Sequence, residues 1–129
     1  MADAVLDGSA ILAVILEEPG ADRVGAYLPG GKVSAVNIGE VVAKLRDLGM
    51  PEPTANEVIA GLQLDVHVHD FHAALAAGHL RPQTRAAGLS VGDRASLALA
   101  QAFRLPTVTS DRSWLAVANG IGVQVELIR

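Results

Sequence analysis

The sequence predicts an α/β protein with a parallel sheet that is covered by helices on both faces. Short apolar segments that suit strands alternate along the chain with segments of helical periodicity, which is the order expected of β-α-β units. The chain has 129 residues and 50% of them are hydrophobic, so one core can bury roughly two-thirds of the unfolded surface. We therefore expect a single domain that spans residues 1–129.

The first quarter of the chain predicts one strand and two helices. Residues 4–6 are a short apolar strand, and Asp7-Gly8-Ser9 forms a turn whose serine can cap a helix over residues 10–18. This helix must end there, because Pro19 disfavours helical geometry in the residue before it. Residues 20–28 favour a second short helix.

A strand and two further helices come next. Residues 32–36 suit a strand, and Asn37 and Glu40 have the spacing of a helix N-cap and its N3 partner. We therefore expect a helix to begin at Asn37, with an apolar stripe formed by Ile38, Val41, Val42, Leu45 and Leu48. Pro53 suits the first turn of the following helix.

The middle of the chain predicts a third strand and one more helix. Residues 65–69 alternate between polar and apolar and therefore favour a strand. Asp70 can cap the helix that follows, and Arg81-Pro82 ends it. Residues 83–88 form a polar linker that is too short to divide the chain into domains.

The last part of the chain predicts a helix between two strands. Ser90 and Asp93 repeat the capping spacing, and the Ala- and Leu-rich run after them predicts a largely buried helix that ends before Pro106. The β-branched residues 107–109 favour a strand, and residues 123–128 supply the final one.

Composition excludes several classes of function. The formal net charge is -4, so the chain lacks a large positive field that would hold nucleic acid indiscriminately. It has no cysteine, which excludes disulfides and thiolate chemistry. The apolar run from Ala10 to Leu16 is far shorter than the roughly 20 residues that span a bilayer. We expect a soluble, cytoplasmic protein without a membrane partner.

Four acidic residues are expected at one edge of the sheet. Asp7 and Asp111 directly follow strands, whereas Glu40 and Asp93 lie on the first turns of helices that begin at the same edge. In open α/β sheets this edge, beyond the carboxyl ends of the strands, holds the ligand crevice. The four acids should therefore converge, and their repulsion should raise the pKa of one or more of them.

Each acid also has a purely structural interpretation. Asp93 and Glu40 can stabilise their helices by capping, with about 1 kcal/mol each, and Asp7 and Asp111 can be ordinary turn formers. A group of four at one edge is better explained by a cation that offsets their repulsion. Ligation by oxygen alone favours Mg²⁺ or Mn²⁺ and gives no reason to expect zinc.

The chain resembles the PIN domain family, and within it the small VapC-type toxins of toxin-antitoxin systems. The resemblance covers essentially the whole chain and rests on four motifs in the family's order: VLDGSAIL, SAVNIGEVV, LSVGDRASLALA and VTSDRSW. Gly8 is a mild departure, since Ala is more usual there. Position by position, the metal-binding and catalytic acids of the family match Asp7, Glu40, Asp93 and Asp111. Asn37 and Ser110 match polar positions that support them.

The resemblance implies a three-layer fold with a five-stranded parallel sheet and a Mg²⁺-dependent ribonuclease that an antitoxin neutralises. We also expect a homodimer. The residue types suit this chemistry, because a carboxylate-bound cation can lower the pKa of water and clamp phosphate oxygens. Arg94, Arg112 and Lys44 are candidates for contact with phosphate, although each can equally be a solvated surface charge.

Two other interpretations remain open. The chain can be a catalytically silent α/β binding module whose acids only cap helices. A flavodoxin-like phosphoacceptor is a third possibility, but the first strand ends in one acid where such proteins carry two. No Ser-His-Asp or Cys-His arrangement is evident for covalent catalysis.

The histidines and the helix faces give further expectations. His67 and His69 should share one face of a strand, but no suitable third ligand follows, so we expect solvent-facing side chains and no metal site there. Trp114 and Leu115 should be core residues. Helices over residues 10–16, 38–48 and 53–62 are more apolar than a small sheet requires, which predicts a groove for an amphipathic antitoxin segment.

Overall fold

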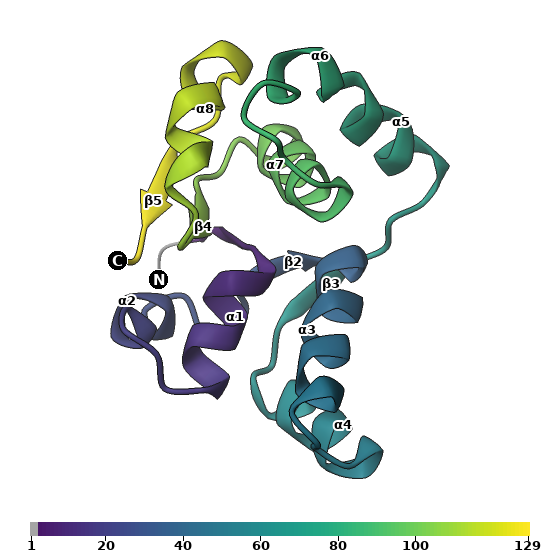
Figure 1. Cartoon of the computed structure of the whole chain (residues 1–129), viewed down its shortest axis with the longest axis vertical. Helices are drawn as coiled ribbons and strands as arrows, with labels where there is room; N and C mark the ends of the chain where they lie inside the picture. The colour runs from purple at the N-terminus through teal and green to yellow at the C-terminus, as the bar shows by residue number, and fades with distance from the viewer. Residues whose placement is uncertain (1–2) are drawn as a thin grey trace.

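The central sheet has five parallel strands, which confirms the predicted fold class. The computed structural model describes residues 3–129 (Figure 1). Its strands lie in the order β3-β2-β1-β4-β5, and all pairs are parallel. In chain order they are β1 (Val5–Leu6), β2 (Lys32–Ser34), β3 (Asp65–His67), β4 (Thr107–Thr109) and β5 (Val125–Leu127).

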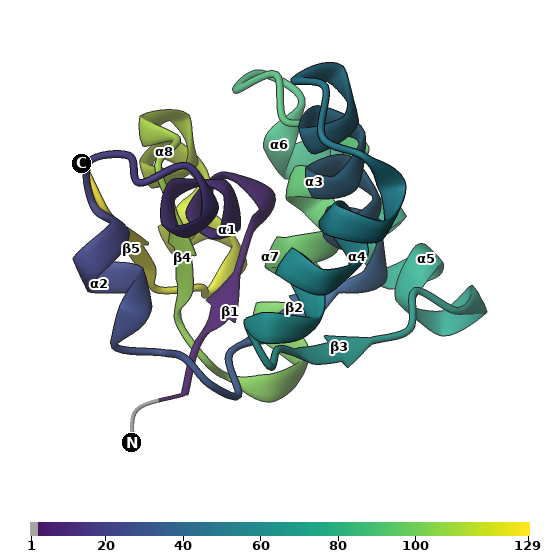
Figure 2. The same cartoon turned by 90° about the horizontal axis from the view of Figure 1, so that it is seen from below.

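Helices cover both faces of this sheet. One face carries α1 (Gly8–Ile15), α2 (Ala21–Gly25), α3 (Ala35–Asp47) and α4 (Glu52–Gly61). The other carries α5 (Phe71–His79), α6 (Arg81–Thr84), α7 (Val91–Phe103), the 3₁₀ turn η1 (Arg112–Trp114) and α8 (Leu115–Ile121). In Figure 1 the first group lies below the sheet and the second above it, and Figure 2 shows α1 beside β4 and α3 beside α4.

Two apolar clusters hold the layers together. Successive residues of β1 point to opposite faces, so Leu6 packs with Ile11 and Leu45 in one cluster, and Val5 packs with Leu97 and Trp114 in the other. All six side chains are at most 1% exposed. The central strand therefore anchors both helical layers, and its carboxyl end is held rigidly.

Two predicted helix starts are wrong by a few residues. The N-cap of α1 is Asp7, whose Oδ1 accepts from the amide of Ala10 at 2.8 Å, and Ser9 lies inside the helix. The N-cap of α3 is Ser34, whose hydroxyl accepts from Val36, because β2 ends two residues earlier than expected. Asn37 therefore lies within α3 and does not cap it.

Other local predictions are confirmed. Asp70 caps α5, and Ser90 and Asp93 form a capping box at the start of α7. Proline also occupies the first turn of α4.

The remaining differences concern short elements. The expected second helix is only the five residues of α2, and β3 ends at His67, two residues early. The polar linker overlaps α6, whose buried Thr84 donates to the carbonyl of Leu80 at 2.8 Å. Helix α8 was not predicted, and Leu115 at its start is 50% exposed, so only Trp114 of that pair is a core residue.

No helix within residues 3–129 combines the length and the apolar character that crossing a membrane requires.

Candidate functional site at the carboxyl edge of the sheet

The strand order changes direction at β1, so that successive strands are added first on one side of it and then on the other. From β1 the chain first adds β2 and β3 on one side and then returns to add β4 and β5 on the other. Ligand crevices in such sheets lie at this switch point, beyond the carboxyl ends of the two strands. Asp7 directly follows β1, and Ser110 and Asp111 directly follow β4. The topology therefore places these residues at the expected crevice.

Asp7 is buried and fully hydrogen-bonded. It is 5% exposed; its Oδ1 accepts from the Ser9 hydroxyl at 2.7 Å and from the Ala10 amide, and its Oδ2 accepts from the Thr109 hydroxyl at 2.6 Å. Burial raises the pKa of Asp7 to about 6; the three hydrogen bonds oppose this shift, and the charge of Asp93 adds to it slightly. Desolvation is therefore the main cause, and not the repulsion expected from the sequence.

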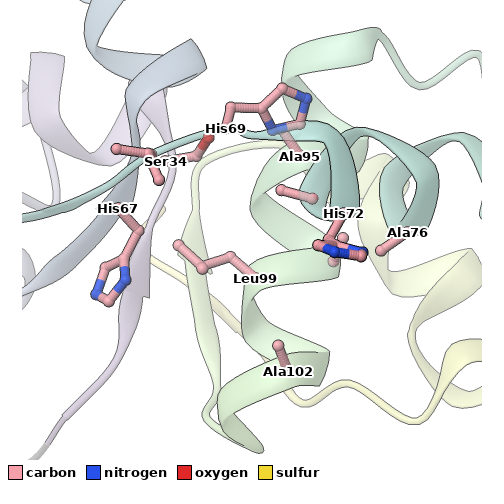
Figure 3. Close-up of a pocket in the computed structure, with 11 residues that line it drawn as sticks. Ser34, His67, His69, His72, Ala76, Ala95, Leu99 and Ala102 are labelled. Atoms are coloured by element: carbon pink, nitrogen blue, oxygen red, sulfur yellow. The ribbon is translucent and has the colours of Figure 1, made fainter.

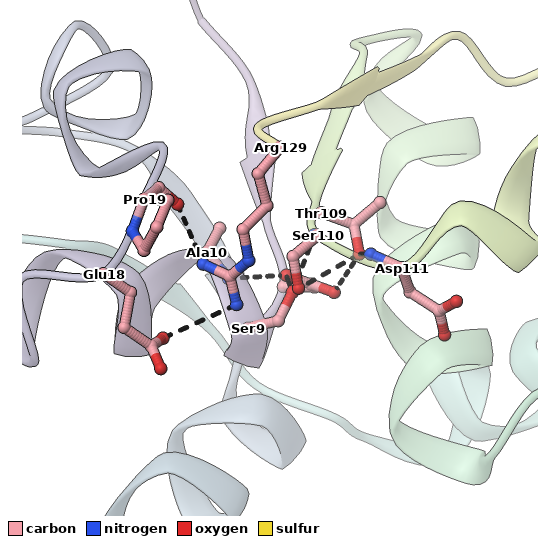
Figure 4. Close-up of polar contacts among 9 residues, drawn as sticks. Ser9, Ala10, Glu18, Pro19, Thr109, Ser110, Asp111 and Arg129 are labelled. Carbon is pink, nitrogen blue, oxygen red and sulfur yellow. Dashed lines mark hydrogen bonds and ion pairs between the residues drawn. The ribbon is translucent and has the colours of Figure 1, made fainter.

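Hydroxyl groups join the ends of β1 and β4. The amide of Ser110 donates to the Ser9 hydroxyl at 2.9 Å, and the amide of Asp111 donates to the Thr109 hydroxyl at 3.0 Å (Figure 4). Sequence reasoning missed Ser9 and Thr109, because it assigned the first to a cap and the second to a strand. The sequence contained one signal for them: Ser9 lies two positions after Asp7, and Thr109 lies two positions before Asp111.

Asp111 faces its own turn. Its Oδ1 accepts from the amide and the hydroxyl of Ser113 at 2.9 and 2.7 Å, which caps η1. Figure 4 shows its carboxylate directed away from Ser9 and Thr109. The side chain is exposed and can rotate.

Asp93 is the N3 residue of the capping box. Its Oδ2 accepts from the Ser90 amide at 2.9 Å, and its own amide donates to the Ser90 hydroxyl at 3.1 Å. Its effect on the pKa of Asp7 places the two carboxylates within electrostatic reach. Asp7, Asp93 and Asp111 thus each cap a helical segment.

Glu40 differs from the other three acids. It extends from α3, and its Oε1 accepts from Nδ2 of Asn37 at 2.9 Å; among the described residues it accepts from no backbone amide. Nδ2 of Asn37 also donates to the carbonyl oxygen of Gly92 at 3.1 Å. A Cβ at Gly92 would overlap with the Glu40 carboxylate, and one at Gly8 would lie 3.8 Å from its Oε1. Glu40 therefore reaches the starts of both α1 and α7.

The acids share an edge but are not arranged as a closed metal site. Among residues 3–129, no three His, Cys, Asp or Glu side chains are close enough to hold a metal ion as they stand. The donor types nevertheless fit Mg²⁺ or Mn²⁺, since both prefer carboxylate and amide oxygens. Oδ1 of Asn37 is a buried acceptor without a hydrogen-bond partner, which a cation or its water could satisfy.

The basic candidates lie close to these acids in sequence. Arg94 follows Asp93 on α7 and is half-buried, and its Nε has no hydrogen-bond partner. Arg112 is exposed on η1, and Lys44 is exposed one turn after Glu40 on α3. Their role in phosphate binding stays a prediction.

Three of the four histidines lie beside a cavity whose lining includes none of the four acids. His67, His69 and His72 line a cavity of about 260 Å³ between β3, α5 and α7, whose other walls are mostly alanine (Figure 3). His67 bonds to Oδ2 of Asp65 at 3.1 Å and packs edge-on against Phe103, with ring centroids 4.8 Å apart. The expectation that the strand histidines simply face solvent is therefore wrong for His67.

Exposed apolar side chains gather on or next to β3, α5 and the end of α7. Among residues 3–129, five of the eight exposed large apolar side chains belong to this region: Val66, Val68, Phe71, Leu75 and Phe103. The large apolar side chains within α1, α3 and α4 are buried or half-buried, and the antitoxin groove expected there stays a prediction.

Comparison with known proteins gives a consistent result. A family model described as PIN domain matches residues 4–120. The fold is similar to that of a chain in the toxin-antitoxin complex from Klebsiella pneumoniae, with a TM-score of 0.76, 17% identity and 98% of each chain covered. It is also similar to a chain of DNA-bound VapBC from Salmonella typhimurium, with a TM-score of 0.75, 19% identity and 100% of each chain covered. No curated protein sequence matches the chain.

Proposed function

The chain belongs to the PIN domain family, and from this premise we propose that it is a Mg²⁺-dependent endoribonuclease, the toxin of a type II toxin-antitoxin pair. Nuclease activity is general in the family, and similar solved structures include toxin-antitoxin complexes. The proposal names Asp7, Glu40, Asp93 and Asp111 as the acids that hold the metal.

One observation carries the proposal: the Glu40 carboxylate is held at the sheet edge without capping a helix. Capping accounts for Asp7, Asp93 and Asp111, so their presence alone does not separate a nuclease from a silent binding module. Glu40 contacts the start of α7, whose helix dipole attracts it, yet within residues 3–129 it accepts a hydrogen bond only from the side chain of Asn37. A carboxylate secured in this way beside Asp93 is better explained by a ligand.

The roles of the residues follow from their mobility. Asp7 is fixed by burial and three hydrogen bonds and would serve as the rigid anchor of the site. Asp111 is exposed and Asp93 is half-buried, so these two side chains can turn toward a cation, whereas Asn37 holds the Glu40 carboxylate in place. A bound Mg²⁺ would activate water and neutralise charge on the phosphodiester. Arg94 and Arg112 would bind the substrate phosphate, and Ser110 would fix the backbone beside Asp111 through Ser9.

The test is the isosteric variant Glu40→Gln, with Glu57→Gln on the exposed side of α4 as its matched control. We expect Glu40→Gln to reduce Mg²⁺-dependent cleavage of RNA at least about 100-fold, because it removes one metal-binding charge. Its circular dichroism spectrum and melting temperature should stay close to wild type. Equal cleavage rates in both variants would leave the binding-module interpretation in place.

The proposed partners are an antitoxin and a second copy of the chain. An antitoxin side chain such as Arg or Lys would compete with the metal for the acids.

We expect the second copy to cover the apolar face around Val68 and Phe71, which are 75% and 73% exposed, more than an isolated chain needs to leave in water. Sedimentation should give a dimer for wild type and a monomer for Phe71→Glu. A wild-type monomer at high concentration would contradict this.

A further inference from the structure

Asn37 connects two elements that are distant in sequence. Its Nδ2 donates one hydrogen to Glu40 on its own helix and the other to the carbonyl oxygen of Gly92, at the start of α7. The side chain is 2% exposed, so water does not compete for these two bonds. Both donors are used, and Oδ1 is left buried without a partner.

Gly92 contributes space to the same arrangement. Its backbone does not have a positive φ, so glycine is not required there by conformation. An added Cβ would overlap with both oxygens and Cδ of Glu40. Because these atoms are the far end of a flexible side chain, an alanine at position 92 would displace the carboxylate without breaking the packing of the helix.

We propose that Asn37 and Gly92 form a cradle that positions the Glu40 carboxylate for metal binding: Asn37 holds one oxygen to the start of α7, and Gly92 provides the room. The inference rests on the proposed function, since positioning has no purpose without a ligand. The unpartnered Oδ1 of Asn37 supports it, because a buried acceptor at this place is satisfied when a cation or its bound water arrives. Asn37 is thus a positioning residue that also offers its Oδ1 to the cation or to its bound water.

Substitution by alanine at Gly92 separates positioning from stability. Gly92→Ala should leave the melting temperature equal or higher, because alanine favours helices more than glycine does. It should weaken Mn²⁺ binding at least about tenfold, as loss of a supporting contact commonly does. The matched control is Gly39→Ala, next to Glu40 on α3, where a Cβ meets nothing within 4 Å. That variant should gain stability and bind Mn²⁺ like wild type.

Asn37→Asp tests the other half of the cradle. It keeps the size of the side chain, removes both donated hydrogens and sets a negative charge against Glu40, so the carboxylate should be displaced and Mn²⁺ binding should weaken at least about tenfold. Asn37→Leu, which removes the polar group without the added charge, should weaken Mn²⁺ binding at least about tenfold.

The decisive measurement is Mn²⁺ affinity by calorimetric titration of wild type, Gly92→Ala, Glu40→Gln and the double variant. Since Gly92 acts only through Glu40, we expect Gly92→Ala to weaken binding in the wild-type background and to have no further effect in Glu40→Gln. Wild-type affinity in Gly92→Ala, or an equal loss in both backgrounds, would overturn the cradle alone. A wild-type protein that does not bind Mn²⁺ would overturn the proposed function and the cradle with it.

Discussion

Asp7→Asn should remove a large part of the pH dependence of folding. The carboxylate of Asp7 is buried, and burial raises its pKa from 3.8 to about 6. The unfolded chain has the ordinary value, so the folded metal-free protein binds a proton more tightly than the unfolded one. This group therefore favours the fold at low pH, and that contribution is lost as pH rises through the folded value.

The size of the effect follows from the two pKa values. A difference of roughly two units corresponds to about 3 kcal/mol between the protonated and the ionised state. Between pH 4.5 and 7, where most of the folded Asp7 loses its proton, the free energy of unfolding should fall by about 2 kcal/mol from this group alone.

Urea unfolding in the presence of a chelator measures this directly. Asparagine has the shape of the aspartate, can accept from Ala10 and can donate to Thr109, so Asp7→Asn should fold and lack this dependence on pH. The control is Asp70→Asn, in which an exposed N-cap receives the same substitution. The comparison uses the difference in the free energy of unfolding between wild type and Asp7→Asn. If this difference is constant from pH 4.5 to 7, and Asp70→Asn has the same pH dependence as wild type, then burial of Asp7 does not cause the pH dependence of stability.

Three further substitutions test the roles of two helix caps and of one turn glycine. Asp93→Ala and Asp70→Ala each remove a helix-capping carboxylate and should each cost about 1 kcal/mol of stability, measured by urea unfolding. Millimolar Mg²⁺ should stabilise wild type and Asp70→Ala by about 2.7 kcal/mol at a hundredfold excess over Kd, and it should not stabilise Asp93→Ala. An equal increase in the stability of both variants would contradict the proposed metal site. Gly20→Ala should cost about 1–3 kcal/mol, because φ is +96° and a Cβ would lie 2.5 Å from the carbonyl oxygen of Ile128; an unchanged urea midpoint would refute this.

Local sequence signals predicted the order of strands and helices well. The apolar periodicity of α3, the N-cap of α5 and the capping pair of α7 depend on residues close together in the sequence, and these elements are confirmed. Errors occur where a helix start depends on where the preceding strand ends. The predicted cap Asn37 lies three residues after the observed N-cap Ser34, because the end of β2 is set by its pairing with β1 and β3, which local sequence patterns do not reveal.

The contacts within the site depend on residues far apart in the chain. Ser9 and Ser110 are 101 residues apart, and Asn37 and Gly92 are 55 residues apart. The motifs indicated which acids share the sheet edge, because strand order places them there. A hydroxyl residue two positions from each strand-end acid is visible in the sequence, but its bonds between β1 and β4 depend on the folded backbone. The same is true of the space that Gly92 leaves for Glu40.

Helix capping and metal binding are not competing explanations of the acids. A strand that ends at the crevice is followed by a helix or turn whose first amides point toward the same edge, and an acid placed there accepts from those amides. The bonds hold Asp7 rigid and stabilise its charge against burial, so in the proposed metal site they would keep this ligand in place before the cation arrives. Because capping explains an acid with or without a metal, the evidence for a ligand comes from the carboxylate that caps nothing. That residue is Glu40, and its support by Asn37 and Gly92 is the feature of the edge that helix stability alone does not require.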